Sequence, residues 1–589
     1  MSAEPLPTLP ARRQVVARPP AGVAVVATLR RHLGLTITLV MLAVFFGWPL
    51  VDIALRSVTT TGMPTFDPSK FTWQNYQVVF TSSGLRKVML NTVIVAGASA
   101  LVVLVLAFPA AYLISRVSKR TAALLYALFF IPFFISILIR LFAFTQILST
   151  NGPINQAFGA IGLGPYHLLF NRFATTLGMV SYLLPYAVLV MYAGMASVDP
   201  SLTTAAKVSG ASNWQAFRRV YLPQVRSSVI GAVLLTFVMG LGFFLTPAIL
   251  GGVDSTTVSS YISAQVQNFQ WGVASAVGIV LLVATVVLFV AAIRISGLTT
   301  LVAGFGTGKG TSRQERLRFS PLSVGLWIVT VIGLIVLIVP ALFVFPIAVQ
   351  QSNFIVWPPS GFTFHWYAQA LEDLQWSSAI FKSFRVGLVS MALAVVLGFL
   401  AARALLKMRR QSARSAFSAL VYAPMVVPII LLAVGSYGPM QRMGLLGTDF
   451  GLAASQAMLA LPFTATTFLA SLGGLDRRVE QASWTLGASA AITTRRVIVP
   501  LILPSVIGAA LLGFVNSWDE PVIALFQSQG SDSTLPVLIF SFVKSGPEPT
   551  IAAVGSGLIV LVVLAYIGPA LLRRRGKRPN RRAGLRGAQ

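Results

Sequence analysis

Two adjacent carboxylates, Asp519 and Glu520, lie within a long apolar stretch of the chain. A charged side chain is costly inside a bilayer, so such residues default to a transport pathway or to a paired site. Trp518 and Asn516 lie just before them, and together the four residues could offer opposite charge and an aromatic face to an ammonium group. Neighbours on a helix point about 100° apart, so we expect at most one carboxylate to face a pathway while the other pairs or caps.

The alternative is that both carboxylates contact the opposite half of the molecule and hold the two halves in register. Arg140 lies in another apolar stretch. It could be the partner of the carboxylates or a structural anchor near the outer surface, and we favour the anchor. The residues predicted to line a pathway for a small cation are Asn516, Trp518, Asp519 and Glu520.

Other chemistry is poorly supported by the residue types. The chain has no cysteine and only three histidines, which are scattered, so we predict no metal site, no disulfide and no catalytic residue. The stretch GFGTGKGT at 304–311 invites interpretation as a phosphate-binding loop. That interpretation fails because Ala303 stands where the motif needs its first glycine, and Gly310 follows Lys309. We therefore expect no cofactor in this chain.

One loop occurs twice in the sequence. The first copy spans 199–223 and the second spans 476–500, and their aspartate, alanine, glycine, arginine and proline positions match at a spacing of 277. Each copy predicts a helix, a sharp turn at a Gly-Ala step and a second short helix ended by proline. A single copy would be interpreted as an ordinary basic loop, but two copies in register argue against that.

The composition is that of a membrane protein. Hydrophobic residues make up 56% of the chain, charged residues 10%, and the mean hydropathy is +0.80. The net charge of +29 comes from 44 Lys and Arg residues, of which 34 fall in the segments assigned to the inside. This bias follows the positive-inside rule, so the basic charge indicates topology and lipid contact rather than nucleic-acid binding.

The apolar runs predict an all-α integral membrane protein with about 12 transmembrane helices in two tandem six-helix halves. Both termini are expected in the cytoplasm. The predicted spans lie near 35–55, 88–114, 122–148, 174–197, 228–251, 271–293, 324–350, 384–405, 416–438, 453–473, 506–527 and 550–572. The predicted regions are an N-terminal tail (1–33), a first half (34–295), a linker (296–320), a second half (321–572) and a basic tail (573–589).

Two halves with an even number of spans form a parallel repeat. The major facilitator fold is also built in this way, so an ion-coupled secondary transporter of 6+6 helices is the alternative from another class. The paired loops at 199–223 and 476–500 distinguish the two, because that fold does not require them.

The paired loops resemble the EAA loop of binding-protein-dependent ABC importer permeases, whose core is E-A-A-x-x-x-G followed by L-P. The acidic position is Thr204 in the first copy and Gln481 in the second, with Glu480 one residue early. The resemblance implies type I permease halves whose loops dock on a separate ATPase. The residues that it assigns to this coupling are Ala205, Ala206, Gly210, Ala211, Pro223, Glu480, Ala482, Gly487, Ala488 and Pro500.

Further stretches resemble the spermidine/putrescine-type permeases. IPFFISILIRLFAF and FFLTPAILGG are similar to the first subunit of that pair, and SWDEPV and STLPVLIFSFVKSGPEPTIAAV are similar to the second. The whole chain then looks like a fusion of two permeases. Fused permeases are also typical of the similar iron(III) importers, so an iron(III) permease remains an alternative.

The resemblance also implies an activity and a set of partner proteins. We expect a bacterial inner-membrane permease that is not itself an enzyme and that imports polyamines or related organic cations by alternating access. Two copies of an ABC ATPase, which bind the ATP and Mg, and a soluble extracytoplasmic solute-binding protein are the expected partners.

Overall fold

The computed structural model describes residues 34–60, 62–296, 320–528 and 532–575. The predicted tail at 1–33 lies outside these residues, as do nearly all of the predicted linker and most of the basic tail. The first half contains the helices α2 (Trp48–Ser57), α3 (Gln74–Thr81), α4 (Ser83–Arg116), α5 (Lys119–Phe130), α6 (Ile137–Ile147), α7 (Pro153–Ala160), α8 (Arg172–Ala196), α9 (Pro200–Val208), α10 (Asn213–Ala216), α11 (Leu222–Leu241), α12 (Leu245–Leu250), α13 (Val258–Gln267) and α14 (Trp271–Ser296).

The second half repeats this order. Its helices are α16 (Pro321–Ala348), α17 (His365–Glu372), α18 (Leu374–Lys407), α19 (Gln411–Tyr422), α20 (Ile429–Arg442), α21 (Asp449–Gly473), α22 (Arg477–Thr485), α23 (Ala490–Thr493), α24 (Val499–Leu501), α25 (Leu503–Trp518), α26 (Val522–Gln527), α27 (Leu535–Ser545) and α28 (Pro549–Arg575). Helices α4 and α18 are both 34 residues long, and α8 and α21 are both 25 residues long. Helix α7, which lies in a connecting loop, has no counterpart among the described helices.

Most of the expected spans are found. Among the described residues, eight helices are long and apolar enough to cross a membrane, or ten if each of two bent pairs counts as one span. The third expected span is divided into α5, a 3₁₀ turn (Ile131–Phe134) and α6. The twelfth corresponds to α28. The protein is thus an all-α membrane protein with two similar halves.

Three further predicted spans are broken where continuous helices were expected. The ninth is divided into α19 and α20, which meet at an angle of 97°. The fifth ends as α11 and restarts as α12 after Gly242, and the eleventh ends as α25 and restarts as α26 after Asp519–Pro521. Pro521 cannot donate a backbone N–H and restricts the residue before it, which explains the break in the eleventh span. Asp519 and Glu520 therefore lie in a helix break rather than in the middle of a helix.

The first helix of each half packs partly on the other half. Helix α2 contacts α14 of its own half and α20 of the second half, while α16 contacts α28 of its own half and α4 and α6 of the first. The contact with α20 includes charge: the buried Asp52 carboxylate pairs with Arg56 at 2.5 Å and with Arg442 at 3.6 Å. These crossings interlock the two halves.

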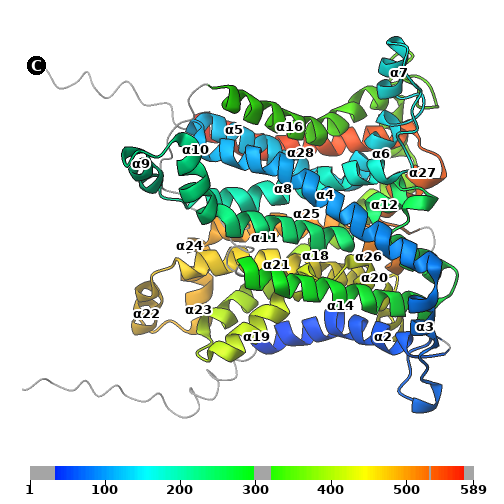
Figure 1. The fold of residues 1–589 in the computed structure, drawn as a ribbon. Helices are drawn as coiled ribbons and strands as arrows, with labels where there is room; N and C mark the ends of the chain where they lie inside the picture. Colours follow the sequence, from blue (N-terminus) through cyan, green and yellow to red (C-terminus); the bar gives the residue numbers. More distant parts are fainter. Residues whose placement is uncertain (1–33, 61, 297–319, 529–531, 576–589) are drawn as a thin grey trace, which may run out of the picture.

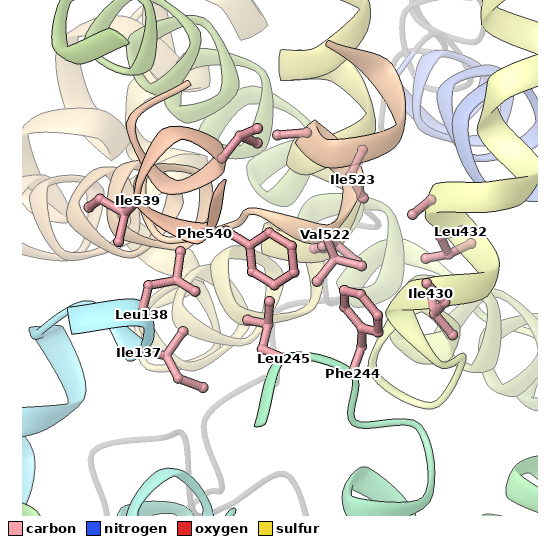
Figure 2. Packing of buried hydrophobic residues seen from close by; sticks show 14 of the residues in the cluster. Ile137, Leu138, Phe244, Leu245, Ile430, Leu432, Val522, Ile523, Ile539 and Phe540 are labelled. Atoms are coloured by element: carbon pink, nitrogen blue, oxygen red, sulfur yellow. The ribbon is translucent and has the colours of Figure 1, made fainter. Parts of the chain in front are cut away.

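One hydrophobic core runs through both halves. Figure 2 shows its centre, where Phe244 and Leu245 from the first half face Val522 and Phe540 from the second. The rings of Phe244 and Phe540 have centroids 6.1 Å apart. Figure 1 shows both α9 and α22 at the left end of the bundle, one above the other, with α3, α7 and α27 at the right end. We call the end with α9 and α22 the loop end.

Candidate functional site

The loop at 199–223 folds as two helices joined by a turn, as the sequence predicts. Pro223 does not end the second helix, however, because the helical backbone continues without a break from Asn213 to Leu241. Asp199 caps α9 by accepting a hydrogen bond from the backbone N–H of Ser201, and this bond lowers the pKa of the Asp199 carboxyl. Gly210 follows α9 with φ of +89°. Ser212 then caps α10, and its backbone N–H donates to the Gln215 side chain in a capping box.

The loop at 476–500 repeats this backbone. Asp476 caps α22 through the backbone N–H of Arg478, Gly487 has φ of +81°, and Ser489 caps α23. A π-helical turn of five residues follows the short helix in both loops, at Phe217–Tyr221 and at Thr494–Ile498. The two loops therefore share one shape as well as one sequence pattern.

The two glycines are required for their backbone conformation. A Cβ atom at Gly210 or Gly487 would meet no atom within 4 Å, so there is room for a side chain. The positive φ is the constraint, because residues with a Cβ pay roughly 1–2 kcal/mol in the left-handed region and β-branched residues fit it worst.

The structure places the other predicted coupling residues at equivalent positions of the two loops. Ala205, Pro223, Ala482 and Pro500 are exposed. The half-buried members are Ala206, Ala211, Glu480 and Ala488. The exposed set lies at the loop end, where a partner can reach it.

Aromatic side chains that the sequence analysis missed hold the first loop against α4. Tyr112 on α4 makes edge contacts with Phe217 and Tyr221, with ring centroids 6.0 and 5.5 Å apart. The Arg116 guanidinium lies 5.0 Å from the ring centroids of both Tyr112 and Tyr221. The contacts that fasten this loop are thus aromatic and cation–π.

An ionic group holds the second loop against α18. Arg403 on α18 pairs with Glu480 at 3.1 Å and donates a hydrogen bond to the Thr494 hydroxyl at 2.5 Å. The Arg403 guanidinium also lies over the Phe399 ring. Glu480 was predicted as a coupling residue, whereas Arg403 and Thr494 were not. A spacing of 291 relates Arg403 to Tyr112, and that repeat was the available signal.

A cavity of about 170 Å³ lies between the two halves. Its walls come from α8, α11 and α21 and from three helix breaks, between α11 and α12, between α19 and α20, and between α25 and α26. A second cavity of about 80 Å³ shares five lining residues with it. Those shared residues are Tyr182, Tyr186, Phe463, Asn516 and Asp519.

Asp519 lines both cavities and also contacts the opposite half. Each of its carboxylate oxygens lies 3.2 Å from the backbone nitrogen of Ile137, which is the first residue of α6. Backbone N–H groups at a helix N-terminus have no partner within the helix, and a negative charge there is favourable. Asp519 therefore lines the cavity and also joins the halves, so its position is compatible with both interpretations that the sequence left open.

Glu520 is buried and is used by its own half. Its carboxylate accepts hydrogen bonds from the backbone N–H groups of Val522 at 2.8 Å and Ile523 at 2.9 Å, so it caps α26. Gln456 on α21 donates to the Glu520 carbonyl at 3.1 Å. Glu520 borders the larger cavity, but its acceptor positions are already directed at the broken helix.

Asn516 and Trp518 lie differently. Asn516 lines both cavities, and its buried Oδ1 atom has no hydrogen-bond partner among the described residues. Trp518 lines neither described cavity and stacks on Phe514, with ring centroids 5.5 Å apart. Trp518 is on the last turn of α25, where the helix phase directs it away from the cavities.

Arg140 is not an anchor near the surface, as we had favoured. Its side chain is buried at 2% exposure, and it donates a hydrogen bond to the Ser181 carbonyl of α8 at 2.9 Å. No ion pair joins Arg140 and Asp519 among the described residues. Within the described ranges, no three His, Cys, Asp or Glu side chains come together in a way that could hold a metal ion.

Comparison with known proteins identifies the family of this chain. A model described as "Binding-protein-dependent transport system inner membrane component" matches residues 103–300 and 394–578. The spermidine/putrescine transport system permease protein PotC of Haemophilus influenzae is 31% identical over 36% of this chain and 83% of that protein. PotB of the same organism is 26% identical over 42% of this chain and 91% of that protein. PotB of Escherichia coli is 28% identical over 41% of this chain and 91% of that protein.

Solved structures of a bacterial alginate ABC transporter also align with part of the chain. One, in complex with an alginate pentasaccharide-bound periplasmic protein, covers 46% of this chain and 97% of the matched chain at 21% identity and a TM-score of 0.40. Another covers 46% of this chain and 98% of the matched chain, at 22% identity and a TM-score of 0.38.

Proposed function

Because the chain belongs to the family of binding-protein-dependent transport system inner membrane components, we propose that it forms the complete membrane pathway of an ATP-driven importer. The family model matches both halves of one polypeptide. The chain is therefore a fused, multi-pass inner-membrane permease of the type I ABC importers. What remains to be proposed is how it couples to ATP and which solute it carries.

We propose that two copies of a separate ABC ATPase dock on the loops at 199–223 and 476–500. The observation that carries this proposal is the shared shape of the two loops, which lie at the same end of the bundle (Figure 1). Two identical partners need two similar surfaces, and the matching glycines, caps and exposed alanines provide them. ATP and Mg would be bound by the ATPase copies, and both termini of this chain would lie on their side of the membrane.

The transport cycle then follows from the arrangement of the halves. Closure of the ATPases would move the two loops together, and rigid-body rocking of the halves would expose the cavity to each side in turn. A soluble extracytoplasmic binding protein would deliver solute at the end of the bundle opposite the loop end. The hydrogen bond between Asp519 and Ile137 crosses the interface between the halves, so rocking would change it.

The proposed solute is a polyamine or a related small organic cation. Two observations support this class: the named relatives are spermidine/putrescine permeases, and a carboxylate from Asp519 lines the cavity between the halves. An iron(III) importer and an ion-coupled secondary transporter are the alternatives, and each predicts a different result in reconstituted liposomes.

The test is reconstitution of the purified chain with its ATPase and binding protein in liposomes. We expect two ATPase copies per chain by native mass measurement, no ATP hydrolysis by the chain alone, and spermidine or putrescine uptake that requires ATP. Uptake driven by an ion gradient in liposomes lacking any ATPase would contradict the importer. Uptake of iron(III) but not of amines would leave the importer standing and replace the solute.

A further inference from the structure

Five residues line both cavities and therefore lie at the boundary between them. We call this group the aromatic ring site: Tyr182, Tyr186, Phe463, Asn516 and Asp519. Two of these residues come from α8 of the first half, and three come from α21 and the end of α25 in the second. The smaller cavity is also lined by Leu512 and Val515, which precede Asp519 on a helix that starts at the loop end. The ring site therefore separates a larger space from a smaller one that continues toward the loop end.

The charge around the two cavities is one-sided. Among their described lining residues there are two carboxylates, Asp519 and Glu520, and no lysine or arginine. The buried Arg140 lies close enough to interact electrostatically with Asp519. The two form no ion pair among the described residues, and the Arg140 guanidinium donates to the Ser181 carbonyl. A ligand entering this space meets negative charge and aromatic faces, which is the combination that attracts an ammonium group.

The two carboxylates differ in the groups that already hydrogen-bond to them. The backbone N–H groups of Val522 and Ile523 already hydrogen-bond to the Glu520 carboxylate. The Asp519 carboxylate accepts from the N–H of Ile137 and from the Ser136 side chain. A carboxylate has about four acceptor positions. Asp519 can therefore keep its contact with α6 and accept hydrogen bonds from an ammonium group in the cavity.

The aromatic walls lie beside this carboxylate. Tyr182 and Tyr186 are one helical turn apart on α8, with ring centroids 5.6 Å apart and hydroxyl oxygens 3.3 Å apart. Tyr182 also packs on Phe243, with centroids 4.9 Å apart. The cation–π surface that the sequence assigned to Trp518 is thus supplied by residues of α8 and α21. Asn516 adds an amide oxygen without a partner.

The first half cannot supply a second carboxylate at the equivalent position. The residue 277 positions before Asp519 is Gly242, and a Cβ atom there would lie 2.8 Å from the Pro428 side chain. Any side chain at Gly242 would have to push α20 away. The first half therefore adds no carboxylate to Asp519 and Glu520 at this position.

We propose that the aromatic ring site holds one ammonium group of the solute, with Asp519 as its counter-charge, the faces of Tyr182, Tyr186 and Phe463 around it, and Asn516 as a further acceptor. This proposal rests on the proposed function, because it concerns the solute of the importer. A polyamine would then pass the ring one ammonium group at a time, with its alkyl segments in the apolar parts of the two cavities.

The test measures ATP-dependent spermidine uptake by the reconstituted transporter, with KM and kcat determined separately. Asp519→Asn keeps an oxygen for the Ile137 N–H and removes the charge, so we expect the KM for spermidine to rise at least about tenfold. Tyr182→Phe keeps the ring and should stay close to wild type, whereas Tyr182→Leu should raise the KM about three- to tenfold. Asp67→Asn removes an exposed carboxylate far from the ring and is the matched control.

The outcomes separate this proposal from the function on which it rests. Wild-type KM values for both Asp519→Asn and Tyr182→Leu, with uptake still dependent on ATP, would overturn the ring site and leave the importer intact. Equal losses for Tyr182→Phe and Tyr182→Leu would also overturn the cation–π role. If Asp519→Asn fails to reach the membrane, the comparison of Tyr182→Phe with Tyr182→Leu decides the outcome. A solute without a positive charge would overturn the ammonium assignment.

Discussion

The two loops at the loop end have the same backbone but are fastened to their halves by different chemistry. Tyr112, Phe217 and Tyr221 hold the first loop through ring contacts, whereas Arg403, Glu480 and Thr494 hold the second through an ion pair and a hydrogen bond. The caps and the positive-φ glycines are common to both. The shape of the loop is therefore set locally, and the contacts that attach it to the neighbouring helix can be exchanged.

The shared glycines should have the largest effect when changed. Replacing both Gly210 and Gly487 by Val puts a β-branched residue in the left-handed region twice, so we expect uptake to be abolished and ATPase binding to weaken while the protein stays in the membrane. Membrane level, ATPase copurification and spermidine uptake are the measurements.

The matched control replaces both glycines by Asn, which tolerates the left-handed region, and it should retain a substantial part of the uptake. Because neither position has an atom within 4 Å of an added Cβ, a clash would not explain a difference between the Val and Asn pairs. Normal transport by the double Val variant would contradict the importance of the turn.

The aromatic fastening of the first loop should contribute more than the ionic fastening of the second. Tyr221 is fully buried, and Tyr221→Ala removes a large ring from the cluster, which we expect to destabilise the loop by about 3 kcal/mol or more. The loss should be the same at low and high salt, since it comes from packing. Thermal stability of ATPase binding in nanodiscs at two NaCl concentrations tests this, and a strong salt dependence would contradict it.

The ionic fastening of the second loop should be weaker and sensitive to salt. The Arg403 and Glu480 side chains are 19% and 27% exposed, and such a pair contributes on the order of 1 kcal/mol or less. We expect Glu480→Gln to weaken ATPase coupling a few-fold at low salt and hardly at all at high salt. A double-mutant cycle with Arg403→Gln isolates the pair, and a coupling energy of zero at low salt would remove its role.

The serine caps should show the smallest difference between the loops. Ser212→Ala and Ser489→Ala each remove an N-cap and should cost about 1 kcal/mol of local stability. Gln215 completes a capping box only in the first loop, so Gln215→Ala should add a few tenths of a kcal/mol there, while its counterpart Ile492→Ala should have no capping effect. Hydrogen exchange of the loop amides measures both, and identical responses would contradict the asymmetry.

The sequence predicted the parts of this protein that repeat. The spacing of 277 identified both loops and their glycines, and the apolar runs located most of the spans, because each feature is local and occurs twice. Thr494 and Arg403 were missed because they are 91 residues apart and differ from their aromatic counterparts. The repeat spacing relates Arg403 and Thr494 to Tyr112 and Phe217, but the residue types differ between the halves, so the repeat did not indicate which side chains make contact.

The pathway residues were harder to place because a helix break changes their directions. On a continuous helix Trp518 and Asp519 would both be candidates for the cavity, but α25 ends between them, so Trp518 packs on Phe514 and Asp519 reaches Ile137. Pro521 indicated a kink in the helix, but not the direction that the chain takes after it. Tyr182 and Tyr186 carried no charge or motif that distinguished them from other aromatic residues in apolar helices.

The crossing of the first helices has a consequence for biosynthesis. Helix α2 meets its neighbour α20 only after more than half of the chain has been made, because α20 begins at Ile429. Until then Asp52 has Arg56 as its only described ion-pair partner, and Arg442 joins them last. The first half therefore stays incompletely packed in the membrane until the second half has been synthesised. Fusing the halves ensures that the awaited partner always arrives from the same ribosome, in equal amount and close by.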